Sequence, residues 1–463
     1  MNKNNYIEYT SMNLITQTDK DELQLNISQL IDNFISINPL SFSYDNFENL
    51  LEEYIYTNIN IILKEVFPHD IDYNEVIIRE SYDIVKKYHF TNYYPIRSYK
   101  YSFIRRPPNS NIISKKIDYI RNKPQPEQRT TEWYNFRHNL ITASSAWKAL
   151  KSEAYKNQLI VEKCKTLNTD KYNSVNTESA FHHGTKYEEV SVKVYENLYN
   201  TKIEDFGCIQ HDTYKCLGAS PDGINVDPKS DRYGRMVEIK NPVSREITGI
   251  PKEEYWIQMQ LQMETCDLNE CDFLETSFKE YDNEEEFYND GTFIYTNNNE
   301  LKGIMVYFIK DSKPFYEYMP IKITKEEFEK WYDEVLEKHS KLTWVKNIYW
   351  RMEKISCILV LRNKYWFNHA IHKIEDVWDI IKTERISGCE HRASKKSRKN
   401  NKLNSNSLND ISNSTINCLI NVNKLQNQII YIDTNYELNI TDISGNINDP
   451  HQQDILMDEI HKN

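Results

Sequence analysis

The sequence predicts an α/β fold in which a mixed central β-sheet is flanked by helices. A helical module precedes this core, and a helical and low-complexity extension follows it. Residues 20–90 repeat apolar positions such as Leu51, Ile55 and Ile59 at helical spacing. From about residue 130 to residue 339, short strand-like runs alternate with helical ones. Six of the ten glycines lie in the central part of that region, where tight turns must connect such elements.

These changes of pattern divide the chain into five predicted parts. They are a mostly helical module over residues 1–122, a linker over 123–130, the α/β domain over 131–340, further helices over 341–386, and a tail over 387–463 that is basic and then asparagine-rich. The prolines and polar residues of "RNKPQPEQRT" indicate the linker. The composition of the tail is typical of a largely disordered segment.

Composition limits the classes of function. The 463 residues carry a formal net charge of −12, which argues against a protein that coats nucleic acid nonspecifically. It does not argue against a nuclease, whose metal site needs clustered acids. The first residues lack the apolar core of a signal peptide, and the run "ISCILVL" is far shorter than a membrane span. We therefore expect an intracellular, soluble protein. The eight scattered cysteines favour reduced thiols over a zinc or iron–sulfur site.

One stretch of the α/β region brings two acids and an amine within reach of one another. "SPDG" places Asp222 in a turn, and "VEIK" follows on a predicted strand. Alternate side chains of a strand share a face, so Glu238 and Lys240 project together while their neighbours face a core. A hairpin between the two stretches would fold Asp222 back beside Glu238.

These groups suit metal-assisted hydrolysis. Two facing carboxylates form a hard, oxygen-rich pocket that suits Mg²⁺ or Mn²⁺, and Lys240 could hold a water beside the ion. Coordination lowers the pKa of a bound water and places positive charge where a phosphorus centre becomes more negative during phosphodiester hydrolysis. An exposed ion pair between Glu238 and Lys240, worth under about 1 kcal/mol, is the alternative. The order Asp222, then Glu238-Ile239-Lys240, resembles the PD-(D/E)XK nuclease motif.

Predicted helices flank this motif on both sides. In "HHGTKYEEVSVKVYENLYN", Tyr187 and Val190 belong to an apolar stripe, and Glu188 lies one step off it, where it could face the site as a third acid. A solvated first-turn acid that suits the helix dipole is the alternative. In "EEYWIQMQLQMETC", Gln258 and Gln262 form an i, i+4 polar pair, which could simply cap a buried helix face.

Two basic segments lie outside this region. "NYYPIRSYKYSFIRRPPNS", residues 92–110, mixes aromatic residues with arginine and lysine, a combination that can stack on bases and pair with phosphates. The alternative is an extended surface segment whose tyrosines pack on a neighbouring domain. "HRASKKSRKNNK", residues 391–402, could touch phosphate or form a solvated tail.

Five motifs in order resemble the lambda-exonuclease or YqaJ viral recombinase family. They are "TEWYNFRHNLITASSAWKAL", "GTKYEEVSVKVY", "LGASPDGI", "VEIKNP" and "YWIQMQLQMETCDLNECDFLE". The resemblance covers about residues 129–320 and leaves both ends unmatched. It implies the restriction-endonuclease-like core of the PD-(D/E)XK superfamily for the domain over residues 131–340.

The resemblance implies a metal site with two Mg²⁺ or Mn²⁺ ions. By position, Asp222 and Glu238 would be the metal-binding carboxylates, and the backbone carbonyl of Ile239 would be a further ligand. Glu188 would complete the site through a metal or a water.

The resemblance also implies residues that act on water and on DNA. Lys240 would position the nucleophilic water, and Gln258 would help to orient it. Arg137 would meet the terminal 5′-phosphate of DNA, and Ser144 would accompany it. A planar guanidinium can grip a phosphate at two places, which an ammonium cannot do.

Double-stranded DNA is the partner that the resemblance implies, together with a single-strand annealing protein and a ring-shaped homotrimer. The size and composition resemble a giant-virus member of the family, acting in the host cytoplasm, a viral factory or the virion. The long N-terminal module, the acidic insertion "KEYDNEEEFYND" and the tail depart from a minimal member. Because the module or the insertion could block a subunit contact, they put the trimer in doubt.

Three functions fit the sequence. The first is a Mg²⁺-dependent DNA exonuclease that resects duplex ends in viral recombination or repair. The second is a structure- or site-selective endonuclease on the same core, since Asp222, Glu238 and Lys240 do not encode dependence on ends. The third is a DNA-binding or packaging protein with an inactive core, whose basic run near residues 391–402 would touch phosphate.

Overall fold

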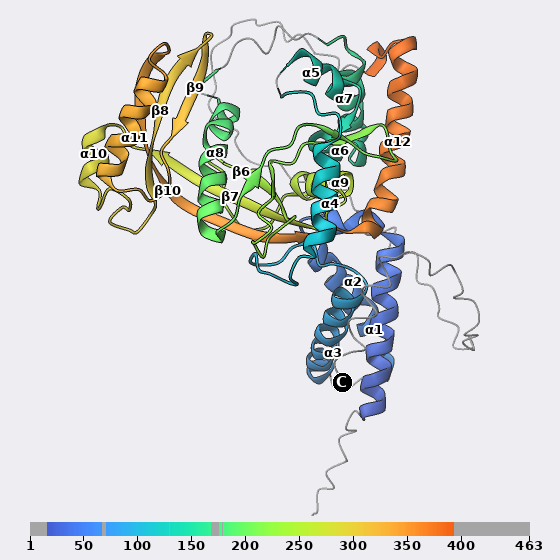
Figure 1. Ribbon diagram of the computed structural model, residues 1–463. Coiled ribbons are helices and arrows are strands. Elements are labelled where there is room, and N and C mark those ends of the chain that lie inside the picture. The colour runs from blue at the N-terminus through green and yellow to red at the C-terminus, as the bar shows by residue number, and fades with distance from the viewer. Residues whose placement is uncertain (1–15, 67–70, 129, 168–175, 178, 393–463) are drawn as a thin grey trace, which may run out of the picture. The chain divides into compact units, whose positions relative to one another are not determined.

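The computed structural model describes residues 16–66, 71–128, 130–167, 176–177 and 179–392 (Figure 1). The chain begins with the helices α1 Gln17–Ile37, α2 Phe47–Val66, α3 Ile71–Asn92 and α4 Ser110–Arg121, with the 3₁₀ turn η1 Pro39–Ser43 after α1. Helix α1 starts at a capping box in which the Asp19 N–H donates to Thr16 Oγ1. Its buried residues recur at helical spacing, as in Ile27 and Ile31. The predicted N-terminal helices are therefore confirmed.

The rest of the described chain alternates helices and strands. The helices are α5 Thr131–His138, α6 Ala143–Leu150, α7 Glu153–Cys164, α8 Ala180–Tyr199, α9 Glu253–Cys266, α10 Glu284–Asn289, α11 Lys325–Lys338 and α12 Lys364–Ser387, followed by the 3₁₀ turn η3 Glu390–Arg392. The strands are β1 Ile141–Thr142, β2 Ile203–Glu204, β3 Ile209–Gln210, β4 Leu217–Ala219, β5 Gly223–Asn225, β6 Met236–Lys240, β7 Glu270–Glu280, β8 Lys302–Lys310, β9 Lys313–Tyr318 and β10 Thr343–Leu361.

A seven-stranded mixed sheet with the order β2-β5-β6-β7-β10-β8-β9 forms the centre of this part. Strands β6 and β7 are parallel, whereas the other neighbouring pairs are antiparallel. Helix α8 covers one face of β6 and β7, because Tyr195 bonds to Asp272, and α9 covers the other, because Gln262 bonds to Glu238 (Figure 1). The predicted mixed central sheet flanked by helices is confirmed.

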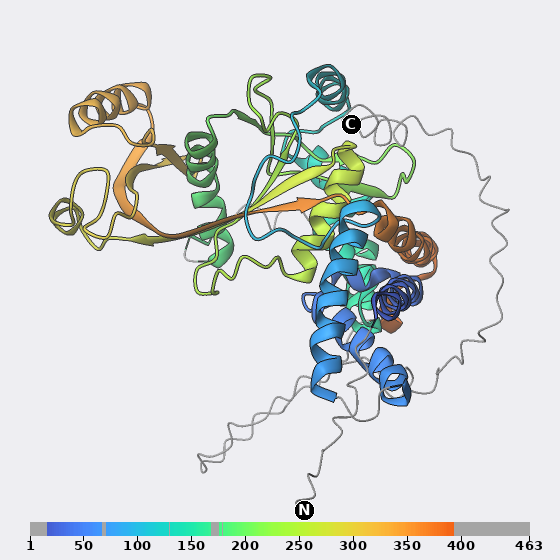
Figure 2. The ribbon, with the colours of Figure 1, turned by 90° about the horizontal axis from the view of Figure 1, so that it is seen from below.

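Strand β10 corrects one prediction. We expected helices throughout residues 341–386, but only α12 is helical there, and the preceding 19 residues form β10. The second half of β10 pairs with β7 and its first half with β8, so the strand runs along the sheet from α12 to the β8–β9 hairpin (Figure 2). Ile348 and Trp350 are buried two residues apart, which is strand spacing. Pairing with partners distant in sequence decides the conformation of such an apolar segment.

The N-terminal helices share a hydrophobic core with the sheet-bearing part. Ile35 and Phe42 belong to the same buried cluster as Trp256 of α9 and Trp366 of α12. Arg97, which follows α3, is buried and donates to the carbonyl oxygens of Pro251 at 2.6 Å and Ser43 at 3.1 Å. Its own carbonyl accepts a bond from Trp256 Nε1 at 2.8 Å. These contacts fix the chain just before α9 to the N-terminal module.

Two further predictions concern the chain ends and the linker. No helix within the described part of the chain is long and apolar enough to cross a membrane. Residues 123–128 have no helix or strand, as expected of a linker. The tail lies outside the described residues from residue 393 onward. The division into domains at the stated boundaries stays a prediction.

Candidate active site

The two acids of the motif lie on neighbouring strands. Strand β5 pairs antiparallel with β6, with Gly223 opposite Val237, so Asp222 lies at the level of Glu238. The N–H of Ile239 donates to Asp222 Oδ2 at 2.7 Å, which holds the Asp222 carboxylate against the backbone of β6. Asp222 is half-buried, and Glu238 is fully buried. The predicted hairpin that folds Asp222 back beside Glu238 is therefore present.

The glycine of "SPDG" is needed for this close approach. A Cβ on Gly223 would lie 2.2 Å from Ile203 Cγ2 on the neighbouring strand β2. Any side chain at position 223 would therefore push β2 away from β5 or shift the turn that carries Asp222.

Glu238 has partners on two sides. Its carboxylate forms an ion pair with Lys240 through one oxygen and accepts a hydrogen bond from Gln262 Nε2 at 2.7 Å through the other. Gln262 also donates to the backbone carbonyl of Ser220 at 3.0 Å, while its own Oε1 is buried without a hydrogen-bond partner in the described residues. Gln258, one helical turn earlier, is half-buried. The glutamine that contacts Glu238 is thus Gln262, and the predicted role of Gln258 in orienting water stays a prediction.

Acidic side chains outnumber basic ones around Asp222. Burial raises the pKa of Asp222 well above its ordinary value, and the charges of Glu238 and Glu188 raise it further against the opposing charge of Lys240. Burial alone would lower the pKa of Lys240, but Glu238 and Asp222 outweigh that effect and raise it. Lys240 is accordingly an ammonium at neutral pH, so it can donate hydrogen bonds but cannot accept a proton there.

A further acid lies beside Lys240 that the sequence analysis missed. In the parallel register of β6 and β7, Glu275 lies opposite Lys240. Its side chain is 1% exposed and forms an ion pair with Arg245 at 2.6 Å. Burial raises its pKa. The ring centre of Tyr255 lies 5.1 Å from Lys240 Nζ and 5.7 Å from the Arg245 guanidinium carbon. Because Glu275 is 37 residues beyond Glu238, only the strand register brings it to the site.

Glu188 does not join the other two acids as closely as expected. It is exposed on α8, and its charge acts on Asp222. Among the residues with a described structure, no three His, Cys, Asp or Glu side chains are gathered closely enough to hold a metal ion. The expected convergence of three acids on one point is therefore not seen. The role of Glu188 stays a prediction.

Asn241, which follows the motif, fixes α8 to strands β6 and β7. Its side-chain amide donates to the carbonyl of Gly184 at 3.1 Å, and its Oδ1 accepts from Ser191 at 2.8 Å and Thr276 at 2.5 Å. Three elements, α8, β6 and β7, thus share one buried side chain. The sequence analysis assigned Asn241 no role, since its partners are distant in sequence.

The predicted phosphate-binding pair, Arg137 on α5 and Ser144 on α6, lies near the start of the "SPDG" turn. Arg137 on α5 donates to Ser220 Oγ at 3.4 Å, and its guanidinium lies 4.5 Å from the ring centre of Trp133. Ser144 is exposed in the first turn of α6, with its Oγ 3.4 Å from Thr142 Oγ1. Because β1 pairs with β4, the start of α6 lies beside the strand that leads into the turn. Ser220 therefore links Arg137 to Gln262 and Glu238.

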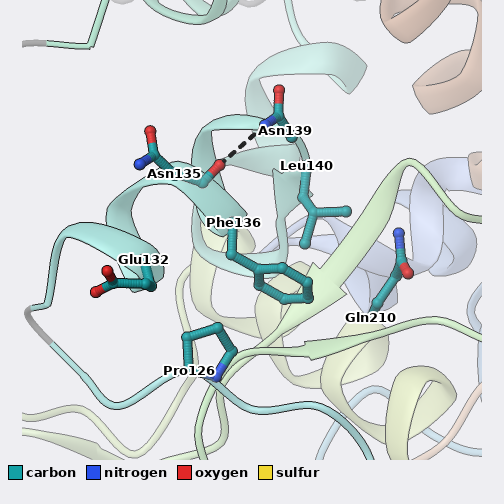
Figure 3. Close-up of a pocket in the computed structure, with 7 residues that line it drawn as sticks. All are labelled: Pro126, Glu132, Asn135, Phe136, Asn139, Leu140 and Gln210. Atoms are coloured by element: carbon teal, nitrogen blue, oxygen red, sulfur yellow. Dashed lines mark hydrogen bonds between the residues drawn. The ribbon is translucent and has the colours of Figure 1, made fainter.

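A cavity of about 300 Å³ lies beside α5 but does not hold the acids of the motif (Figure 3). Phe136 and Leu140 supply its apolar wall, and Glu132 supplies a carboxylate at its rim. Arg137 is not among the residues that line the cavity, and we assign the cavity no part in the site.

A family model and a curated relative match parts of this sequence. Residues 132–269 match the family described as the YqaJ-like viral recombinase domain. The chain is 31% identical over 330 residues to the uncharacterised protein R354 of Acanthamoeba polyphaga mimivirus. That match covers 62% of this chain and 57% of the mimivirus protein, so the chain spans little more than half of that relative's length.

Solved structures with partial similarity include two exonucleases. The alkaline exonuclease LHK-Exo from Laribacter hongkongensis is 18% identical, with a TM-score of 0.33, over 55% of this chain and 94% of that chain. Its complex with dAMP gives a TM-score of 0.31 over the same shares at the same identity. A phage-related exonuclease from Haemophilus somnus 129PT is 14% identical, with a TM-score of 0.28, over 54% and 96%. The family match supports the predicted resemblance of residues 132–269 to the YqaJ-like viral recombinase domain.

Proposed function

We propose that the chain is a metal-dependent DNA exonuclease that hydrolyses phosphodiester bonds at the ends of double-stranded DNA in viral recombination or repair. The observation that carries the proposal is the placement of Asp222, Glu238 and Lys240 together on β5 and β6 within the YqaJ-like domain. The mimivirus relative supports a viral setting.

The residues present fit a divalent cation. Asp222 and Glu238 supply carboxylate oxygens, and the Ile239 carbonyl supplies a neutral one, which is the ligand type that Mg²⁺ and Mn²⁺ prefer. The pKa of Asp222 is raised mainly by burial and further by the charges of Glu238 and Glu188, and a bound cation would oppose both effects. We propose Glu188 as the third acid of a site for two ions. Bound metal supplies positive charge at the scissile phosphate and makes water more acidic.

The protein's own groups would orient the reaction. Lys240, held as an ammonium beside Glu238, can donate a hydrogen bond to the attacking water or to a phosphate oxygen. Its charge state depends on Glu238 and Asp222, so neutralising these acids would lower its pKa. Gln262 fixes one carboxylate oxygen of Glu238 and so sets the direction of the other. Gln258, on the same helix, remains our proposal for orienting water.

We propose that the 5′-phosphate of the DNA end binds between Arg137 and Ser144. Arg137 is half-buried, and its guanidinium makes a long hydrogen bond of 3.4 Å to the Ser220 hydroxyl, which it can exchange for a phosphate. Ser144 offers a hydroxyl in the first turn of α6, where helix N–H groups also favour an anion. This arrangement would make cleavage depend on a phosphorylated end.

The test is digestion of end-labelled linear duplex and of a covalently closed circle, each with Mg²⁺ and with a chelator. We expect loss of label from the linear duplex alone, and only with Mg²⁺. Lys240→Ala should reduce the rate by about 10²–10³-fold. The control Lys310→Ala, at an exposed position at the end of β8, should leave the rate unchanged.

Three outcomes would contradict the proposal. Products from the closed circle would show an endonuclease on the same core. Retention of DNA without any cleavage would show a DNA-binding protein. Full activity of Lys240→Ala would remove the proposed site.

A further inference from the structure

The segment between α3 and α4 is held against the central sheet by backbone hydrogen bonds. The N–H of Tyr99 donates to the carbonyl of Leu359 at 2.9 Å, and the N–H of Ser102 donates to the carbonyl of Cys357 at 3.0 Å. Both acceptors lie in the half of β10 that pairs with β7 on its other edge. Ser102 Oγ also donates to the buried Asp272 at 2.5 Å. The backbone of this segment is therefore fixed, and it lies outside the residues that match the family.

This fixed backbone presents aromatic and basic side chains to solvent. The exposed fractions are 65% for Tyr101, 42% for Phe103 and 37% for Ile104. Three cations are exposed among them, and the ammonium of Lys100 lies 5.3 Å from the ring centre of Tyr101. We call this set the aromatic–basic ridge; its members are Lys100, Tyr101, Phe103, Ile104, Arg105 and Arg106.

The charge around the ridge is entirely positive along the chain. Residues 84–117 contain eight Lys and Arg and no Asp or Glu, although the whole chain carries a net charge of −12. Three of these cations, Lys86, Arg97 and Lys116, are paired with acids elsewhere in the fold. For the three cations of the ridge, no ion pair is present within the described part of the chain. Some of the cations of this segment therefore form ion pairs within the fold, whereas the cations of the ridge are exposed to solvent.

We propose that the aromatic–basic ridge binds single-stranded nucleic acid. Exposed rings can stack on bases, and neighbouring cations can pair with the phosphates between them, without sequence preference. The faces of bases are accessible only when the strand is unpaired, so exposed rings favour a single strand over a duplex. The centre of a protein–protein contact is depleted of charge, which does not suit three unpaired cations in seven residues.

The ridge is separate from the candidate active site. Ser102 bonds to Asp272, whose side chain lies on the sheet face that α8 covers, where it also bonds to Tyr195. Glu238 faces α9 on the opposite side of the same strands. A strand on the ridge would therefore not occupy the site of cleavage. If the chain resects duplex ends, the ridge would hold the strand that resection exposes; only this clause rests on the proposed nuclease function.

The experiment measures binding of the full chain to a fluorescent oligodeoxythymidylate of about 20 nucleotides, longer than the ~4–16 nucleotides of common single-strand sites. A chelator is present, so cleavage plays no part. Tyr101→Ala with Phe103→Ala should raise Kd about tenfold or more, because each stacked base is lost. Lys100→Gln with Arg105→Gln and Arg106→Gln should reduce the slope of log K against log salt by about 2.

Two matched controls separate local from general effects. Lys310→Gln with Lys313→Gln and Lys322→Gln removes the same charge from exposed positions at the β8–β9 end of the sheet. Trp344→Ala removes an aromatic side chain that is 48% exposed on β10. Both should leave Kd close to that of the wild type. All substituted residues are exposed, and circular dichroism spectra verify that each variant is folded.

Unchanged Kd in the aromatic variant, or equal losses in the ridge and control charge variants, would overturn the proposal. Loss of a dimer in the ridge variants together with unchanged Kd would also overturn it and would assign the ridge to contact between copies of the chain. A protein that lacks nuclease activity but shows the expected Kd changes would support the ridge while contradicting the proposed function.

Discussion

The two faces of strands β6 and β7 carry clusters of charged residues that are built differently. On the face covered by α8, Asp272 accepts hydrogen bonds from Ser102, Tyr195, Arg232 and Arg235 and is fully buried. On the face covered by α9, Glu238 pairs with Lys240, and Asp222 lies against the same strand. Both clusters are buried at the centre of the fold, but only one of them is balanced.

On the α8 face, the charges and the donors are matched. Arg232 and Arg235 oppose Asp272, and Arg235 also pairs with Glu270. On the α9 face, Asp222, Glu238 and Glu275 outnumber Lys240 and Arg245, and the buried Oε1 of Gln262 has no partner in the described residues. A balanced buried cluster serves the fold, whereas one with excess negative charge is ready for a cation. The comparison assigns a structural role to Asp272 and a chemical role to Glu238.

The largest effect is expected on the balanced face. Asp272→Asn leaves Arg232 and Arg235 buried without their shared counter-charge, which should cost about 3–5 kcal/mol of unfolding free energy. Urea denaturation followed by circular dichroism measures this loss. The folded fraction should cleave DNA at the wild-type rate. A loss of activity without a loss of stability would contradict the structural role.

On the unbalanced face, Glu238→Gln should act on the reaction instead. The variant removes a proposed metal ligand and the partner of Lys240, so the single-turnover rate should fall about 10²–10³-fold. The midpoint of thermal unfolding without metal should not fall, because the change relieves repulsion with Asp222. A variant that unfolds as readily as Asp272→Asn would show that the two faces do not differ.

Gln262 and Gln258 provide a finer comparison within α9. Gln262→Ala removes the hydrogen bond to Glu238 and to the Ser220 carbonyl, so we expect about a tenfold loss of rate, equivalent to ~1.4 kcal/mol. Gln258→Ala should cost less, since Gln258 does not contact the acids. Single-turnover cleavage of both variants at saturating Mg²⁺ measures the difference. The reverse order of effects would restore Gln258 as the main glutamine of the site.

The smallest effect is a pH-dependent change in stability at Asp222. Its pKa is raised in the folded state, so the folded protein binds more protons than the unfolded one between the two pKa values, and stability falls as pH rises through this window. Asp222→Asn removes this penalty and should raise the unfolding free energy by about 1 kcal/mol at neutral pH without metal.

The gain from Asp222→Asn should vanish below about pH 3, where the carboxyl is protonated in both states, because the ordinary pKa of an aspartate is about 3.9. Mg²⁺ should raise the unfolding temperature of the wild type but not that of Asp222→Asn. Thermal unfolding between about pH 3 and pH 8, with and without Mg²⁺, measures both effects. A gain that is independent of pH would contradict the raised pKa of Asp222.

Local sequence patterns predicted much of the fold and the centre of the site. The turn glycine, the alternation in "VEIK" and the helical stripe around Tyr187 are local signals, and all three describe the structure correctly. Glu275 and Asn241 were missed, because they reach the site through strand register and long-range hydrogen bonds. The sequence predicts helices where β10 lies, because the partners of this strand, β7 and β8, precede it by tens of residues and leave no local signal.

The Arg97 side chain donates a hydrogen bond to the carbonyl of Pro251, and the Arg97 carbonyl accepts one from the Trp256 side chain. The start of α9 is therefore held in place by the N-terminal module. Residues 132–269 therefore lack part of the hydrophobic core and the contacts that support α9. A fragment cut at these borders would expose Trp256 and loosen the helix that positions Gln262, so we expect it to be less stable than the full chain. Shortened versions of this protein must retain the helices from α1 onward.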